Sequence, residues 1–244
     1  MGLSTGNVIY DQDFRDISAD RTMALGTKGY STDGRVYRYA LAGASTLAVG
    51  KMTEEAAIVG NHANRTLSTV AVGAESVDIT TGATVTTADQ YAGGYLNVNA
   101  GTGAGVTYLV KGNDAIASAG GTGTVFLVDP IEVATLTSDS KGTLRVNPFS
   151  SVVVTPSAGT AGGHPTGVPN TSITNAYYGW LQTGGPCALL SDSTVYTLGE
   201  EVSQGASEDA GSGSLKVATL PTYGIAMQLG VSGEYQLVYL TIDS

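Results

Sequence analysis

The residues best suited to nucleophilic chemistry are one cysteine, Cys187, and two histidines, His62 and His164. A catalytic thiol needs a histidine that takes its proton, and neither histidine stands near Cys187 in the sequence. A lone cysteine also cannot form a disulfide within its own chain. We therefore interpret Cys187 as a small buried residue.

Paired carboxylates are the second kind of residue that could do chemistry, since glycosidases need only two. Neighbouring residues of a strand point to opposite faces, so adjacent acids do not converge on one atom. We expect the adjacent pairs to be solvated surface charge, and the acids that stand between serines to belong to turns. The pairs are Glu54–Glu55, Glu200–Glu201 and Glu208–Asp209, and the acids between serines are Asp139 and Asp192.

The glycine-rich stretches lack the spacing of nucleotide-binding loops. In the run 101–106 the third glycine falls one place too early for a dinucleotide fingerprint. The sequence also has no phosphate-binding loop, serine-hydrolase elbow or zinc-protease motif. The motifs therefore give no local support for a catalytic, cofactor-binding or metal site.

Composition narrows the range of partners. With 11 Lys+Arg against 21 Asp+Glu, the 244-residue chain has a formal charge of −10. Such a charge repels phosphate backbones, so binding to nucleic acid lacks its usual driving force. No apolar run approaches the roughly 18 residues of a membrane span, and the first residues lack the basic and apolar regions of a signal peptide. We expect synthesis in the cytoplasm without a signal peptide, and neither a membrane nor a nucleic-acid partner.

The elements that must position any site are predicted to be strands. Gly accounts for 34 residues and charged residues for only 13%, which argues against long charged helices. Short runs rich in Val, Thr and Tyr between turn residues predict an all-β fold of two small β-barrel or β-sandwich domains with an extended N-terminal arm. The predicted parts are the arm at 1–33, a first β domain at 34–155, a linker or long loop at 156–172 and a C-terminal small β-barrel at 173–244.

The C-terminal part carries two aromatic features. Alternation places Tyr178 and Trp180 on one face of a strand, either in the core of this part or in contact with a partner. A sharp corner is predicted at 184–186, and the final strand at 235–242 carries apolar groups on both faces. A strand of that kind is covered on both sides, so we expect its second face to contact the first domain or another subunit.

Short motifs rich in glycine and aromatic residues recur from about residue 33 to the C-terminus. They are Asp33–Ala40 with Gly43–Ala44, Tyr91–Val98, Asn147–Phe149, Gly167–Pro169, Tyr178–Pro186 and Tyr223–Ala226. In these motifs the chain resembles the head decoration (capsid cement) proteins of tailed bacteriophages. The resemblance implies a non-catalytic virion protein that binds the outer surface of the capsid, with the major capsid protein as its partner and no cofactor.

A decoration protein gains avidity by binding several capsid subunits at once, and a trimer matches a local threefold axis of the shell. We therefore expect a homotrimer. The arm would bury two aromatic side chains against the shell and pair two arginines with acidic groups, or else it covers its own first domain. The candidate capsid or subunit contacts are Tyr10, Phe14, Arg15, Arg21, Tyr178 and Trp180.

Two other classes of protein stay open from the sequence. One is a phage or bacterial surface adhesin that binds glycans through exposed Tyr and Trp, and the other is a carbohydrate-active enzyme that uses two carboxylates. An isolated adhesin should bind cells or glycans, and an enzyme should release reducing ends. A decoration protein should do neither and should bind purified heads.

Overall fold

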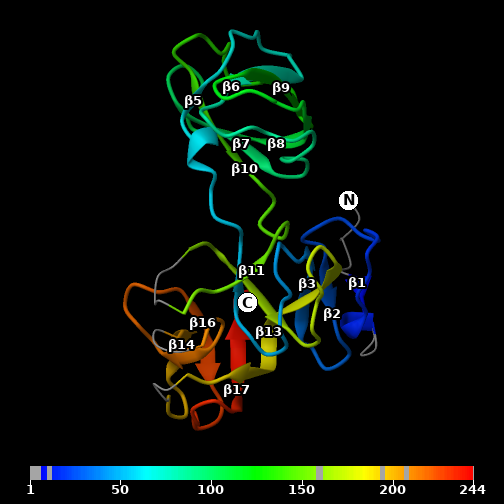
Figure 1. The fold of residues 1–244 in the computed structure, drawn as a ribbon, viewed down its shortest axis with the longest axis vertical. Coiled ribbons are helices and arrows are strands. Elements are labelled where there is room, and N and C mark those ends of the chain that lie inside the picture. Colours follow the sequence, from blue (N-terminus) through cyan, green and yellow to red (C-terminus); the bar gives the residue numbers. More distant parts are fainter. Residues whose placement is uncertain (1–6, 10–12, 158–161, 193–195, 206–208, 244) are drawn as a thin grey trace. The chain divides into compact units, whose positions relative to one another are not determined.

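A computed structural model describes residues 7–9, 13–157, 162–192, 196–205 and 209–243 (Figure 1). Strands make up 42% of the structure and helices 3%, which confirms the predicted all-β class. The two short 3₁₀ turns are η1 (Asp13–Arg15) and η2 (Gly60–His62). No helix within the described ranges is long and apolar enough to cross a membrane.

The chain folds as two compact units. Unit 1 comprises Met1–Ala56 and Pro148–Ser244, and unit 2 comprises Ala57–Asn147. The predicted boundaries at 34, 156 and 173 do not coincide with these units. The reason is that β3 (Val36–Leu41) pairs with β13 (Tyr178–Leu190), so segments on both sides of unit 2 belong to one sheet.

Unit 1 is built on an eleven-stranded sheet, which is antiparallel except where β1 meets β2. Its main path runs β1-β2-β3-β13-β17-β16-β14-β15, and β4, β11 and β12 pair beside this path. The strands not yet given are β1 (Asn7–Val8), β2 (Lys28–Tyr30), β4 (Thr53–Glu54), β11 (Val153–Val154), β12 (Pro165–Pro169), β14 (Glu201–Gln204), β15 (Gly213–Leu215), β16 (Thr222–Ala226) and β17 (Tyr235–Thr241).

β13 is one continuous strand of 13 residues. The corner predicted at 184–186 is wrong, because these residues continue β13 and pair with Thr241, Leu240 and Tyr239 of β17. A bulge in the pairing with β3 lies just before them, between Gln182 and Gly184. Gly185 has a φ of +82°, a backbone conformation open to glycine at little cost. The bulge redirects the strand without ending it.

The predicted linker at 156–172 is also corrected, because its second half is β12. This strand pairs with β13 and with β4, and Val168 is fully buried. The Thr166 and Thr53 hydroxyls are 2.8 Å apart in the buried contact between β12 and β4. Glycine and proline indicated a loop, but partners distant in the sequence hold this segment as a strand.

The described residues of the N-terminal segment belong to unit 1, which corrects the prediction of an extended arm at 1–33. β1 pairs with β2, and β2 pairs with β3. Ile9 and Phe14 are buried, with 5% and 1% of their surface exposed. The structure therefore supports the second alternative, in which this segment covers its own domain.

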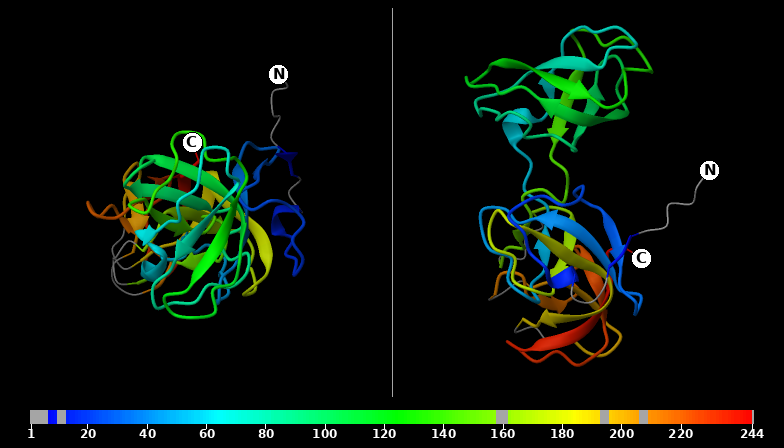
Figure 2. Two further views of the ribbon diagram at one scale, coloured as in Figure 1. Left: turned by 90° about the horizontal axis from the view of Figure 1, so that it is seen from above. Right: turned by 90° about the vertical axis from the view of Figure 1, so that its right-hand side faces the viewer.

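Unit 2 is a nearly closed barrel with strand order β5-β10-β7-β8-β9-β6. A bridge between Leu67 and Ile79 and a 2.8 Å hydrogen bond from the Ser68 N–H to the Asp78 carbonyl join its first and last strands. In Figure 2 its strands, cyan to green, curve around one core. They are β5 (Arg65–Thr66), β6 (Ser76–Thr80), β7 (Tyr95–Ala100), β8 (Val106–Asn113), β9 (Thr122–Leu127) and β10 (Lys141–Arg145).

Candidate functional site

The final strand, β17, has one buried face and one bare face. Val238 and Leu240 lie in the core of unit 1 with no exposed surface, whereas Tyr235, Leu237 and Tyr239 are 52%, 37% and 47% exposed. The sequence predicted apolar groups on both faces, and the structure confirms them. Within unit 1 the second face stays uncovered.

Neighbouring strands extend this bare surface. Residues directly opposite one another in antiparallel strands share a face, and Pro186 and Ile225 are both paired with Tyr239, while Ala188 is paired with Leu237. Each of these side chains is at least partly exposed. We call the resulting uncharged surface the β17 face, made of Pro186, Ala188, Ile225, Met227, Tyr235, Leu237 and Tyr239.

Gly50 holds one end of the β17 face in place. A Cβ at this position would come within 2.5 Å of the Tyr235 ring, so the ring lies directly on the glycine backbone. Gly50 has a φ of +68°, and its carbonyl accepts a 2.8 Å hydrogen bond from the Leu190 N–H. A larger residue there would be strained and would displace Tyr235.

A groove of about 300 Å³ adjoins the β17 face and shares Pro186, Ala188 and Tyr235 with it. Arg15 and Arg35 line this groove. The Arg35 Nε lies 2.7 Å from the Asp33 carboxylate, and both guanidinium groups lie over the Phe14 ring, at 5.5 Å and 5.1 Å. The surface therefore combines an apolar centre with positive charge at one border, in a chain that is acidic overall.

Phe14 is part of the core, so the expectation that it contacts a partner is wrong. Its ring stacks on Tyr37, with centroids 4.7 Å apart and planes 12° apart. Arg15, on the same turn, is exposed and lines the groove, so its side chain is accessible to a partner. Arg21 is exposed but does not line the groove, and its Nε donates to the Met23 carbonyl at 2.9 Å. Tyr10 lies outside the described residues.

Tyr178 and Trp180 lie on one side of β13, as the alternation predicted. Both contact Tyr39 of β3. Tyr178 stacks on Tyr39 with centroids 5.8 Å apart, and Trp180 meets it edge-on at 5.4 Å. Trp180 is only 4% exposed, which supports its assignment to the core and excludes it as an exposed glycan platform.

The thiol and the histidines do not form a catalytic pair. Cys187 is buried, and burial raises the pKa of its thiol to about 12, so the thiol stays protonated at neutral pH. His62 belongs to unit 2, where its ring bonds to the Tyr91 hydroxyl and, at 3.0 Å, to the Thr84 carbonyl. Both residues are structural, as interpreted for Cys187 from the sequence.

Glu54 and Glu55 are buried, which corrects the expectation of solvated surface charge. The Glu54 carboxylate accepts hydrogen bonds from the Gly162 and Gly163 N–H groups, both at 3.2 Å, and Glu55 accepts one from the His164 N–H at 3.1 Å. Burial raises the pKa of Glu54 above its usual value. The donors lie more than a hundred residues away, so no local signal reveals this role.

Asp192 is likewise buried, and the turn predicted around it extends into residues 193–195, which lie outside the described residues. Glu201 and Asp209 are exposed as expected, and Glu208 lies outside the described residues. No group of three or more His, Cys, Asp or Glu residues in the described part of the chain could hold a metal ion. Comparisons of the chain with protein-family models, with curated proteins and with solved structures find no match.

Proposed function

We propose that this protein is a capsid decoration protein of a tailed bacteriophage that acts as a homotrimer on the outer surface of the shell. The observation that supports the proposal is the β17 face. Homo-oligomer contacts are richer in apolar surface than transient ones, and Tyr and Met are favoured in them. The seven residues of the β17 face include no charge, so we assign it to the contact between copies of this chain.

The arginine side of the groove, with Arg15 and Arg35, is the proposed contact with the major capsid protein, whereas Pro186, Ala188 and Tyr235 belong to the contact between copies. Arginine pairs well with carboxylates at interfaces, and Arg15 is exposed at the groove. A trimer presents three such grooves. Because three linked contacts bind far more tightly than one, trimerisation and attachment to the shell are coupled.

Leu237 and Leu109 provide a matched test, since each is 37% exposed on a strand. We expect Leu237→Asp to convert a trimer into monomers in light scattering and to weaken binding to purified undecorated capsids by about 10²-fold or more. Leu109→Asp, which lies in unit 2, should change neither result. A parent chain that is monomeric and also fails to bind capsids would contradict the proposal.

A charge reversal separates attachment from trimerisation. Arg15→Glu should weaken capsid binding while the trimer mass stays unchanged, because Arg15 lies outside the β17 face. Arg21→Glu is the control, since Arg21 is an exposed arginine of the same segment that does not line the groove. Equal losses in both variants would show that general charge, and not the groove, guides binding.

A further inference from the structure

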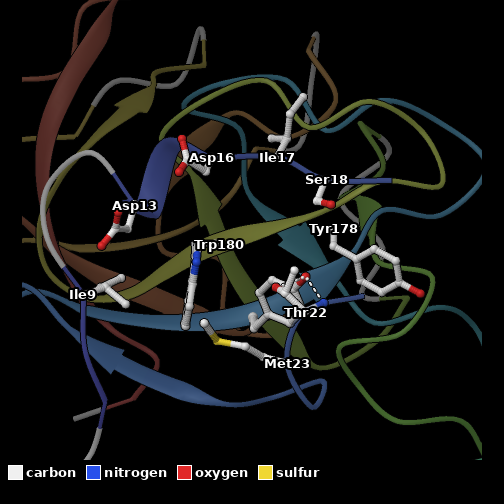
Figure 3. Close-up of a pocket in the computed structure, with 10 residues that line it drawn as sticks. Ile9, Asp13, Asp16, Ile17, Ser18, Thr22, Met23, Tyr178 and Trp180 are labelled. Carbon is white, nitrogen blue, oxygen red and sulfur yellow. Dashed lines mark hydrogen bonds between the residues drawn. The ribbon is translucent and has the colours of Figure 1, made fainter. Parts of the chain in front are cut away.

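The groove beside the β17 face lies where the two proposed contacts meet. Pro186, Ala188 and Tyr235 line the groove and also belong to the β17 face, whereas Arg15 lines the groove from outside that face. The larger cavity drawn in Figure 3, of about 630 Å³, lies beside the N-terminal segment and shares no lining residue with the groove or the β17 face. Of these two cavities, only the groove adjoins the proposed contact between copies.

A network of side-chain amides fixes the floor of the groove. Gln182 lines the groove with no exposed surface, and its Nε2 lies within 3.2 Å of the carbonyl oxygens of residues 184–186. Its Oε1 accepts a 2.8 Å hydrogen bond from the Asn170 side chain. A ligand that binds to such a preformed floor loses little affinity to the ordering of side chains.

Two polar groups of the groove suit a ligand. The Asn170 Oδ1 lies 3.6 Å from the Cys187 thiol, and because a thiol is a weak donor, this oxygen can accept a stronger hydrogen bond. The Arg15 guanidinium is exposed at the groove and suits a carboxylate. A backbone N–H and a carboxylate occur together in a single Asp or Glu residue of an extended peptide.

The surroundings of the two arginines assign the carboxylate to Arg15. The Arg35 Nε already lies 2.7 Å from the Asp33 carboxylate. The Phe14 ring, which is 1% exposed, supports the Arg15 guanidinium at 5.5 Å from the ring centroid. Because the chain carries a formal charge of −10, it repels a polyanion as a whole. One acidic residue in an otherwise neutral segment avoids most of that repulsion.

We propose that each groove holds one acidic residue of an extended segment of the capsid protein between two copies of this chain. This inference rests on the proposed function. A copy that covers the β17 face lies against Pro186, Ala188 and Tyr235, so it also bounds the groove on the side formed by these residues. The binding site is therefore incomplete in a single copy.

A shared site couples attachment to trimerisation at each groove. The second copy excludes water from the groove, and an ion pair is stronger where water is excluded. One groove of the trimer should therefore bind the acidic segment more tightly than the same groove of a monomer, in addition to the avidity of three linked grooves. The coupling is reciprocal, so an occupied groove must stabilise the trimer.

A monovalent probe separates this coupling from avidity. The probes are a capped pentapeptide with one aspartate between alanines and the same peptide with asparagine in place of the aspartate. In calorimetry we expect the acidic peptide to bind the parent trimer about tenfold more tightly than the Leu237→Asp monomer. Leu237 belongs to the β17 face and does not line the groove. Leu109→Asp is the matched control and should bind the peptide like the parent.

Equal affinity of the acidic peptide for the parent trimer and the Leu237→Asp monomer would overturn the shared site, although the trimer and its binding to capsids would stand. Equal binding of the neutral peptide, or no binding of the acidic peptide by a trimer that binds capsids, would also overturn it. A parent chain that is monomeric and fails to bind capsids would instead contradict the proposed function.

A second measurement uses the parent chain alone and does not depend on how Leu237→Asp folds. In light scattering at decreasing protein concentration, a saturating amount of the acidic peptide should keep the trimer intact to about tenfold lower concentration. The neutral peptide should have no such effect. If the acidic peptide leaves the dissociation of the trimer unchanged, the groove is not shared between copies.

Discussion

Two leucines with the same exposure, Leu237 in unit 1 and Leu109 in unit 2, have different surroundings. On the outer face of β8, Leu109 stands between Thr107 and Lys111, whereas on β17 Leu237 stands between Tyr235 and Tyr239. On the outer surface of unit 2, polar side chains of neighbouring strands form hydrogen bonds with one another. These bonds include Thr80–Thr122, Thr124–Asp78, Thr143–Asn99 and Lys141–Thr66.

The two units therefore differ in the side chains that cover the outer side of their sheets. Polar side chains satisfy one another in water, and on the outer side of unit 2 they alternate with the exposed side chains of Tyr95, Leu109 and Phe126. Removing an uncharged apolar surface from water is favourable by about 25 cal/mol per Å². Under the proposed function, unit 1 therefore carries the surface through which copies of the chain associate.

Removal of the N-terminal segment should produce the largest difference in stability between the two units. A chain that starts at Asp33 loses β1, β2 and the buried side chains of Ile9 and Phe14, each worth about 2–5 kcal/mol in a core. We expect unit 1 to unfold and unit 2 to remain folded. Limited proteolysis with mass spectrometry should then leave a resistant fragment close to residues 57–147. If both units keep the melting temperatures of the full chain, the segment is not part of the core.

A substitution in unit 2 should affect that unit alone. His62→Leu leaves the buried Tyr91 hydroxyl without its partner, which costs about 1–3 kcal/mol. We expect one of two calorimetric transitions to move to lower temperature while the other stays in place. The control is His164→Leu, since His164 is exposed in unit 1. A shift of both transitions by His62→Leu would show that the two units unfold together.

The smallest expected effect is a pH dependence confined to unit 1. Because the pKa of Glu54 is raised from its usual value of 4.5, the folded state binds this proton more tightly than the unfolded state. The stability contributed by Glu54 is thus present below that value and lost as the pH rises through the raised pKa. In Glu54→Gln this loss disappears, so the melting temperature of the variant relative to the parent should increase with pH across that window. Glu201→Gln, at an exposed site, should show a constant difference, and a constant difference for Glu54→Gln would contradict the assignment.

The sequence by itself determined the features that depend on neighbours along the chain. Alternating Val and Ile between turn residues predicted the strand at 76–80, which is β6. The two-sided apolar pattern of 235–242 and the burial of Cys187 followed from the residues themselves. These predictions held because side chains of a strand alternate with period two, and because turn residues act locally.

Only the tertiary structure decided which residues meet across long separations. The buried carboxylate of Glu54 depends on donors near residue 162, and β12 is a strand because β4 and β13 accept it. The discontinuous unit 1 follows from the pairing of β3 with β13. The same pairing places Tyr39 against Trp180. Contacts of this kind depend on the path of the backbone in space, which leaves no signal in the spacing of residues.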